Sequence, residues 1–260
     1  MKYRKAVVAG LFYPEFADQL RDELKTSLDC ASDPKIRPHA LIVPHAGYSY
    51  SADIAGKAYA YITAFASQIK RVIILGPSHR VALQGCAICS YDAFTTPLGK
   101  IDIATDSYRK LLKLGLVKID DRAHLLEHSL EVQLPFLQYC LKNFAVVPIV
   151  VGQCQPETVS AILNTLQVND GKSLIIVSSD LSHYHSYQQA QILDDLSINK
   201  INNYVATITG DEACGCYAIN GLLTYADAQK WQIKLLKKAN SGDVLKAKEE
   251  VVGYASFILY

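Results

Sequence analysis

The chain has 260 residues, which is long enough for one large domain whose core needs neither a disulfide nor a metal for stability. Its 26 basic and 25 acidic residues nearly balance and are scattered, so the charge favours neither nucleic acid nor a membrane surface as a partner. No stretch reads as a secretory signal or a membrane-spanning helix, and the odd count of seven cysteines indicates free thiols in a reducing cytoplasm.

Helix and strand patterns alternate along the first part of the chain. Residues 14–31 predict a one-sided helix, because apolar residues recur every four positions from Phe16 to Leu28. The elements predicted next are a buried strand ending at His45, a helix at 51–69, a buried strand ending at His79, and two strands within 85–104 joined by a turn at Pro97–Gly99.

The alternation continues to the end of the chain. We predict helices at 106–115 and at 129–143 (interrupted by Pro135), a strand at 144–153, a helix at 156–168, a strand at 173–180, helices at 187–204 and 219–231, and a strand at 251–259. The helix at 187–204 carries Ile192, Leu196 and Ile198, and the final strand alternates as an edge strand would. These patterns predict a single α/β domain over residues 1–260, with a central, mostly parallel or mixed sheet flanked by helices.

Three of the predicted buried strands end at polar residues that could bind a metal or transfer protons. They lead to His45, to His79, and to Asp180 with His183. If the strands are parallel, their carboxyl ends share one edge of the sheet, where open α/β sheets bind ligands. Neutral imidazole is a common metal ligand and transfers protons near neutral pH, although a histidine hydrogen-bonded in a loop explains each single case as well. The sequence therefore predicts a crevice that gathers these groups.

Two pairs of polar residues are three positions apart. Asp180 could orient the ring of His183, or it could cap the helix that follows. His128 and Glu131 would share one helix face, turned either to the site or to solvent, unless Ser129 caps the helix and leaves His128 in the loop.

The cysteines differ in their surroundings. Cys86 and Cys89 form a C-x-x-C without a second pair, so we expect them to be buried as small hydrophobic residues. Cys214 and Cys216 precede a helix in a Gly-flanked loop, where the helix dipole favours a thiolate. A thiolate there could complete a metal site with two imidazoles or act as a redox thiol.

Several long motifs, in the same order along the chain, closely resemble those of the Memo family, whose prokaryotic members are called protein B of the AmmeMemoRadiSam group. The motifs are AGLFYP at 9–14, PHAGYSYS at 44–51, GPSH at 76–79, TPLG at 96–99, EHSLEVQLPFL at 127–137, SSDLSHY at 178–184 and CG at 214–215. The resemblance implies a single α/β domain similar to class III extradiol dioxygenases, whose non-haem iron is bound by two histidines and a glutamate.

Carried onto this chain, the resemblance implies metal binding by His45, His79 and Cys214, with the cysteine in the place of the glutamate. It implies that His183 moves protons and that Asp180, His128 and Glu131 surround the centre. Cys216 is a competing thiol, and a thiolate ligand makes copper or zinc an alternative to iron. The resemblance also implies a functional association with radical-SAM and AMMECR-like proteins.

The leading functional prediction is a cytoplasmic metalloprotein with a dioxygenase-like site for redox chemistry on a small substrate. The alternative is a non-enzymatic adaptor that binds a peptide or protein in the same crevice. The aromatic residues expected to line this crevice are Tyr13, Tyr48, Tyr50 and Tyr184. Metal-assisted hydrolysis is a third possibility, since it needs only an open metal position and a nearby base.

Overall fold

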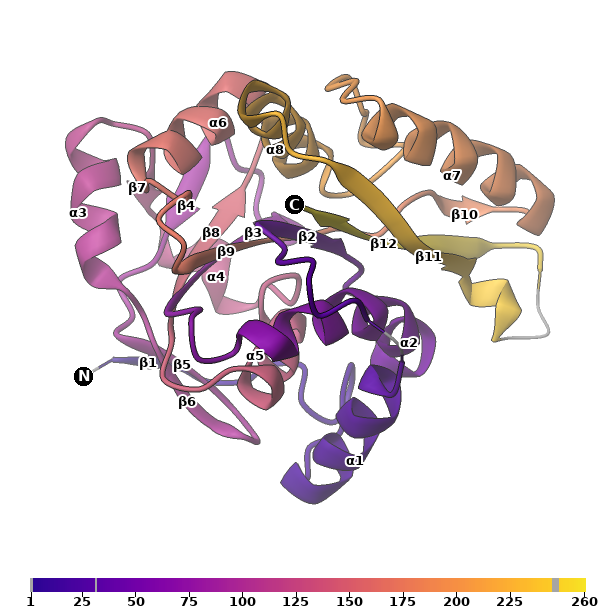
Figure 1. Cartoon of the computed structure of the whole chain (residues 1–260), viewed down its shortest axis with the longest axis horizontal. Helices are drawn as coiled ribbons and strands as arrows, with labels where there is room; N and C mark the ends of the chain where they lie inside the picture. Colours follow the sequence, from indigo (N-terminus) through magenta and orange to yellow (C-terminus); the bar gives the residue numbers. More distant parts are fainter. Residues whose placement is uncertain (1, 31, 245–247) are drawn as a thin grey trace.

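Figure 1 shows the computed structural model of the chain, which describes residues 2–30, 32–244 and 248–260. Within these residues the central sheet has nine strands, in the order β10-β12-β2-β9-β3-β8-β4-β7, with β11 paired to β12. The four middle strands are mutually parallel: β2 (Ala40–Val43), β9 (Ser173–Ser178), β3 (Arg71–Pro77) and β8 (Ala145–Val151). They are buried almost throughout, as apolar β-branched runs are when helices cover both faces of a sheet. The predicted α/β class is confirmed.

The remaining strands extend this sheet or form a smaller one. At one end β10 (His183–His185) and β11 (Ile233–Asn240) pair antiparallel with β12 (Val251–Leu259), and at the other β4 (Cys86–Ile88) pairs with β8 and with β7 (Lys118–Ile119). A separate three-stranded sheet contains β1 (Tyr3–Arg4), β5 (Ala93–Thr96) and β6 (Gly99–Asp102).

Helices lie on both sides of the central sheet (Figure 1). On one side α2 (Tyr48–Tyr59) packs against β2, β11 and β12, next to α1 (Ala17–Leu28) and α5 (Leu134–Cys140). On the other side α8 (Cys216–Gln229) packs against β3 and β9, next to α6 (Pro156–Thr165). The others are α3 (Thr105–Lys113), α4 (Asp121–Leu125), α7 (Tyr187–Asn202) and 3-10 turns at Ala60–Phe65, Glu131–Gln133 and Ser241–Asp243.

The carboxyl ends of the parallel strands lie side by side. Val43 at the end of β2 is paired with Ser178 at the end of β9. On the opposite side of β9 lies β3, which is also paired with it. His45, His79 and Asp180 each come two residues after the end of their strand. The predicted meeting of these strand ends at one edge of the sheet is therefore confirmed.

One prediction about the last third of the chain is wrong. β12 is not an edge strand, because it lies between β2 and the two strands β10 and β11 and is buried nearly throughout. The helix predicted at 187–204 is present as α7. Of the apolar residues named on it, Ile198 is buried, whereas Ile192 is 64% and Leu196 is 53% exposed. Its inner face carries Ala190, Asp194, Ser197, Ile198 and Ile201.

Two segments are more divided than predicted. Residues 85–104 contain three strands, and the expected turn joins the second and third of them as a hairpin. Residues 129–143 begin as a loop and a 3-10 turn, and the α-helix starts only at Leu134, where Pro135 lies in its first turn. Proline is tolerated there because the first helical N–H groups have no partner within the helix. The end of the first predicted helix, Ala31, lies outside the described residues.

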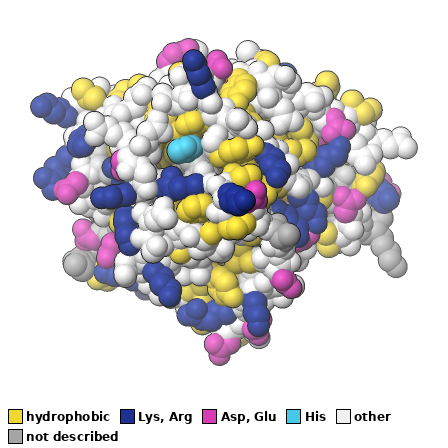
Figure 2. Space-filling model, viewed as in Figure 1, with side chains coloured by type: hydrophobic (Ala, Val, Ile, Leu, Met, Phe, Trp, Pro, Cys, Tyr) yellow, Lys and Arg dark blue, Asp and Glu magenta, His cyan; other side chains and the backbone are white. Residues whose placement is uncertain are grey.

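The surface seen in Figure 2 is mixed in character. Lys and Arg side chains are scattered over this face among acidic, hydrophobic and uncharged groups. In residues 2–30, 32–244 and 248–260, none of the helices combines the length and the apolar character that crossing a membrane requires.

Candidate metal centre

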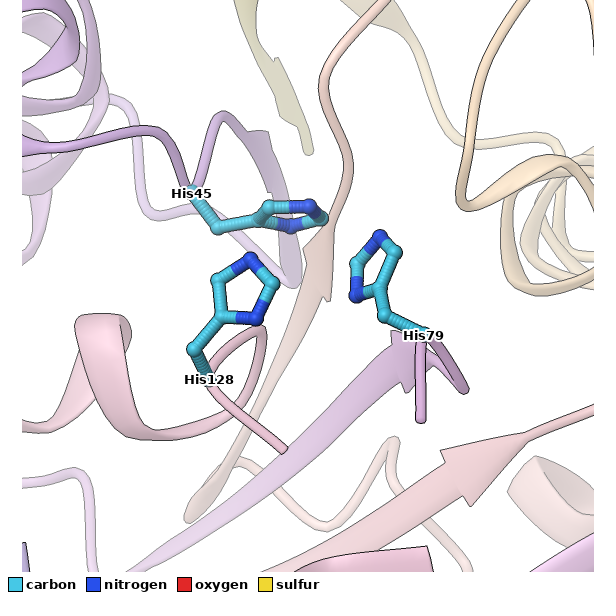
Figure 3. Close-up of side chains that lie close together, drawn as sticks. All are labelled: His45, His79 and His128. Carbon is cyan, nitrogen blue, oxygen red and sulfur yellow. The ribbon is translucent and has the colours of Figure 1, made fainter. Parts of the chain in front are cut away.

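Three imidazoles converge at the carboxyl edge of the sheet. His45 follows β2, His79 follows β3, and His128 lies in the loop before α5; Figure 3 shows their rings gathered around a common space. One ligand nitrogen from each ring lies within 4.8 Å of the other two. Nitrogen ligands of one ion, each at about 2.0–2.1 Å, are at most about 4 Å apart, so small side-chain rotations would let the three rings bind one ion.

A hydrogen-bond chain fixes the tautomer of His45. The Ser178 hydroxyl donates its one proton to the Ser129 carbonyl oxygen at 2.6 Å. Ser178 Oγ must then accept from Gln133 Nε2 at 2.8 Å and from His45 Nδ1 at 3.0 Å. The Gln133 amide is oriented because its Nε2 also donates to the Pro44 carbonyl oxygen. The ring proton of His45 is therefore on Nδ1, and Nε2 keeps its lone pair.

A buried carboxylate fixes His79 in the same way. Glu127 accepts from His79 Nδ1 at 2.9 Å and from the His79 backbone N–H at 2.6 Å, and also from the Ser129 backbone N–H. Burial alone would raise the pKa of Glu127, but the hydrogen bonds that it accepts from His79 and from the Ser129 backbone help to lower that pKa to about 2. With the carboxylate on Nδ1–H, the lone pair of His79 Nε2 is free, an arrangement typical of metal-binding histidines.

His128 is the least satisfied of the three rings. Its Nδ1 is buried and has no hydrogen-bond partner among the described residues, although Glu127 Oε1 is 3.5 Å away. Burial, followed by the neighbouring His45, lowers the pKa of His128 to about 4. Burial and then His79 lower the pKa of His45 to about 3. Both rings are thus neutral at pH 7, the form that binds a metal.

Cys214 lies against the other side of His45. Its Sγ is 3.3 Å from His45 Nε2, and because Nε2 carries no proton, the thiol donates this hydrogen bond. The Asp180 backbone N–H donates to the same sulfur at 3.3 Å. Burial, reinforced by the Asp180 carboxylate, raises the pKa of the Cys214 thiol. Cys214 would therefore have to lose a proton before it could bind a metal, since only a thiolate is a strong ligand.

Two glycines let the loops of the site come this close to the sheet. A Cβ at Gly76, in β3, would be 2.8 Å from the Ser129 Oγ, next to His128. A Cβ at Gly215 would be 2.6 Å from the Ser179 Cβ, next to Cys214. Both positions therefore require the absence of a side chain.

The cluster lies in a cleft of about 950 Å³. The cleft is also lined by Asp180, His183, Tyr184 and His185, which come from the β9 end and β10. Asp180 is buried and accepts from the His45 backbone N–H at 2.8 Å, so it shapes the loop after β2 and does not cap a helix. Burial raises the pKa of Asp180.

Glu131 does not face the cleft. It is fully buried and forms an ion pair with Arg4, while Tyr13 donates to its Oε1 at 2.7 Å. Arg4 also donates to the His124 and Glu127 carbonyl oxygens. The position predicted for Glu131 near the centre is corrected: the pair ties the N-terminal segment to the loop that carries His128.

Three of the four predicted tyrosines do not line the cleft either. Tyr13 and Tyr48 are buried, and the Tyr48 hydroxyl donates to the Val132 carbonyl oxygen at 2.8 Å. Tyr50 is half-buried on α2, and only Tyr184 of the four is among the cleft residues that the structure describes. The rings of Tyr13 and Tyr48 belong to the hydrophobic core.

The sequence reasoning missed the groups that hold the rings in place. Glu127, Ser178 and Gln133 were not predicted to have a role, and His128 was expected to surround the centre without being a candidate ligand. The adjacent acidic and imidazole groups in Glu127-His128 were an available signal. Cys216 is buried at the start of α8, and Cys86 and Cys89 are buried as expected.

The chain is similar to known proteins over nearly its whole length. Residues 4–258 match the family model described as Memo-like protein. The chain is 36% identical to a MEMO1 family protein of Methanosarcina mazei, with 100% of both chains covered. It is 34% identical to one of Sulfolobus acidocaldarius, with 97% of this chain and 98% of that protein covered.

A solved structure has the same fold. The uncharacterized protein JW3007 from Escherichia coli K12 matches with a TM-score of 0.53 over 84% of this chain and 98% of that chain. The two sequences are 12% identical, so the likeness concerns the fold alone.

Proposed function

Because the chain belongs to the Memo-like protein family, we propose that it binds a transition metal ion between His45 and His79 at the floor of the cleft. The observation that carries the proposal is the convergence of three imidazoles whose ligand nitrogens lie within 4.8 Å of one another. The hydrogen bonds of Ser178 and Glu127 support it, since each leaves a free Nε2 lone pair on its histidine.

Two side chains compete for the third position on the ion. Cys214 is the ligand implied by the resemblance to the Memo family, and its sulfur lies 3.3 Å from His45 Nε2. That spacing suits two ligands of one ion at about 2.0 Å and 2.3 Å. His128 belongs to the imidazole cluster and has an unsatisfied ring nitrogen. We propose Cys214 as the third ligand, with His128 next to the ion as a further donor or a proton carrier.

The proposed chemistry is redox chemistry on a small substrate. Iron, or copper as the alternative, would supply electron transfer with dioxygen or a substrate at this centre, whereas zinc would support hydrolysis. His183, on the cleft wall, is the proposed group that moves protons to and from the substrate. Asp180 keeps His45 in position through the backbone and is therefore a positioning residue.

A non-catalytic binding function is the second candidate. The observation that favours it is the size of the cleft, about 950 Å³, with the Tyr184 side chain 73% exposed beside it. Such a site could hold a peptide segment or a small ligand. A cytoplasmic location, indicated by the odd number of cysteines, and an association with radical-SAM and AMMECR-like proteins, implied by the resemblance, remain proposals.

Metal analysis of protein purified without an affinity tag tests the proposal. We expect one equivalent of iron, copper or zinc per chain, and loss of that metal in His45→Ala and His79→Ala. His185→Ala is the matched control, because His185 lines the same cleft outside the cluster. No metal uptake on titration of the wild type, or full retention in both variants, would exclude the centre.

Two further variants assign the third ligand. If Cys214 binds the ion, Cys214→Ala loses metal and the cupric form of the wild type shows a thiolate charge-transfer absorption. If His128 binds it instead, His128→Ala loses metal and Cys214→Ala keeps it. Turnover in a substrate screen by metal-loaded wild type, absent in His183→Ala, would separate the enzyme from the binding module.

A further inference from the structure

We propose that Arg80 makes the cleft selective for a small anionic ligand with a planar body, such as an aromatic carboxylate. This inference concerns the substrate class and rests on the proposed function, since it assigns the ligand that the metal cleft receives. Arg80 directly follows His79, is exposed and lines the cleft.

The guanidinium of Arg80 forms no ion pair or hydrogen bond with any residue that the structure describes. Several other arginines are neutralised. Arg4, Arg71 and Arg122 each pair with a carboxylate. An arginine presents a rigid fork of donors that matches a carboxylate in a bidentate pair. A cation left unpaired beside a ligand cleft is therefore available to an incoming anion.

The carboxylates around the cleft are mostly occupied elsewhere. Glu127 is bound to His79, Asp180 accepts backbone N–H groups of the loop after β2, and Glu212 pairs with Lys200 at 2.6 Å. Asp211 lines the cleft but forms no ion pair with Arg80 in the part of the chain that the structure describes. Arg80 is thus not held in an ion pair by these carboxylates, and a bound metal ion would add positive charge to the cleft.

Tyr184 provides an exposed aromatic ring on the wall of the cleft. Its backbone has φ of +61°, a left-handed conformation that is unfavourable for a bulky residue. It lies where the pairing of β10 with β12 is irregular, between His183 and His185. Tyr184 is 73% exposed and lines the cleft. Strain of this kind is often retained where a side chain serves a ligand, and an exposed ring offers stacking to a planar one.

Binding of two matched probes tests the inference. Benzoate carries the charge, and benzamide has the same shape without it. In calorimetric or NMR titrations of the metal-analysed protein, we expect the wild type to bind benzoate about tenfold more tightly than benzamide. Arg80→Gln should remove this preference while its metal content stays equal to that of the wild type. Arg122→Gln, which changes an exposed arginine outside the cleft, should keep the preference.

The Tyr184 variants test the planar part of the ligand. Tyr184→Ala should lower the affinity for both benzoate and benzamide about threefold to tenfold, and Tyr184→Phe should bind both as tightly as the wild type does. Equal affinity for the two probes in the wild type, a preference that survives in Arg80→Gln, or no detectable binding of either probe would overturn the inference. Metal content, measured separately, reports on the proposed centre, so failure of the anion site and failure of the metal site are distinguishable.

Discussion

Ser178 orients the His45 ring through Nδ1 and so leaves free Nε2, the nitrogen that we propose as the metal ligand. Its hydroxyl proton is committed to the Ser129 carbonyl, so its oxygen accepts from His45 Nδ1. We expect Ser178→Ala to raise the dissociation constant of the metal about 10- to 100-fold, because the orientation and tautomer of the ring are no longer fixed. The unfolding free energy should fall by about 1–3 kcal/mol, because buried donors lose their acceptor. Competition titration with a chelator and urea unfolding measure the two effects.

Ser256→Ala is the matched control for this change. Ser256 is fully buried in β12, and its hydroxyl has no hydrogen-bond partner among the residues that the structure describes. Its removal should leave metal affinity unchanged and should not destabilise the protein. Equal metal affinity of Ser178→Ala and the wild type would contradict the assigned tautomer.

The low pKa of His128 predicts how stability depends on pH. Its folded pKa of about 4 lies below the ordinary value of 6.5, so the unfolded chain binds more protons between these values and acid favours unfolding. For metal-free protein, going from pH 7 to pH 5 should cost about 2 kcal/mol through this one ring. Urea unfolding should show that His128→Asn loses less stability than the wild type over this interval. An equal loss in both proteins would show that His128 is not held neutral.

At the residue scale, the sequence predicts the histidines that follow the strands, but not the side chains that hold these histidines in place. Pro44 before His45, and Gly76 with Pro77 before His79, mark where the chain leaves the sheet, so both imidazoles could be placed at its edge. The contact of Glu127 with His79 joins residues 48 positions apart, and no spacing rule points to it. Such contacts form only when segments distant in sequence pack together in the fold, and a local residue pattern does not reveal them.

At the scale of elements, the loop that carries Cys214 depends on a close contact between Gly215 and the end of β9. We expect Gly215→Ala to lower the unfolding free energy by about 1–3 kcal/mol, because its Cβ would overlap Ser178 and Ser179. It should also weaken metal binding by displacing Cys214. Gly210→Ala is the control in the same loop, since a Cβ there meets nothing within 4 Å. The same urea midpoint for both variants would contradict the contact.

Elements were predicted best where burial and periodicity agree. The parallel strands are continuous apolar runs, which fits burial on both faces and fixes their carboxyl ends. The alternation of β12 suggested an edge strand, but its polar Ser256 is fully buried and its Gly253 makes room for the buried Asp194 of α7. The buried face of α7 includes Asp194, so apolar residues alone do not identify this face.

Over the whole molecule, one sheet edge collects residues from position 45 to position 214. The β2, β3 and β9 ends supply His45, His79 and Asp180, and loops before α5 and α8 add His128 and Cys214. One hydrophobic core cluster, from Val8 to Leu259, supports this edge. The general position of the site could be predicted from topology, because parallel strands place their ends together. The position of His128 could not be predicted in this way, because its loop is held at the sheet edge by contacts between residues distant in sequence.

The most direct test of the metal centre is X-ray absorption spectroscopy at the edge of the bound metal, on the wild type and on His45→Ala and His79→Ala. The account predicts scattering from at least two imidazole rings with nitrogens at about 2.0–2.1 Å, and weaker imidazole scattering or loss of the metal in each variant. A wild-type spectrum without imidazole scattering, or one that is unchanged in both variants, would contradict it.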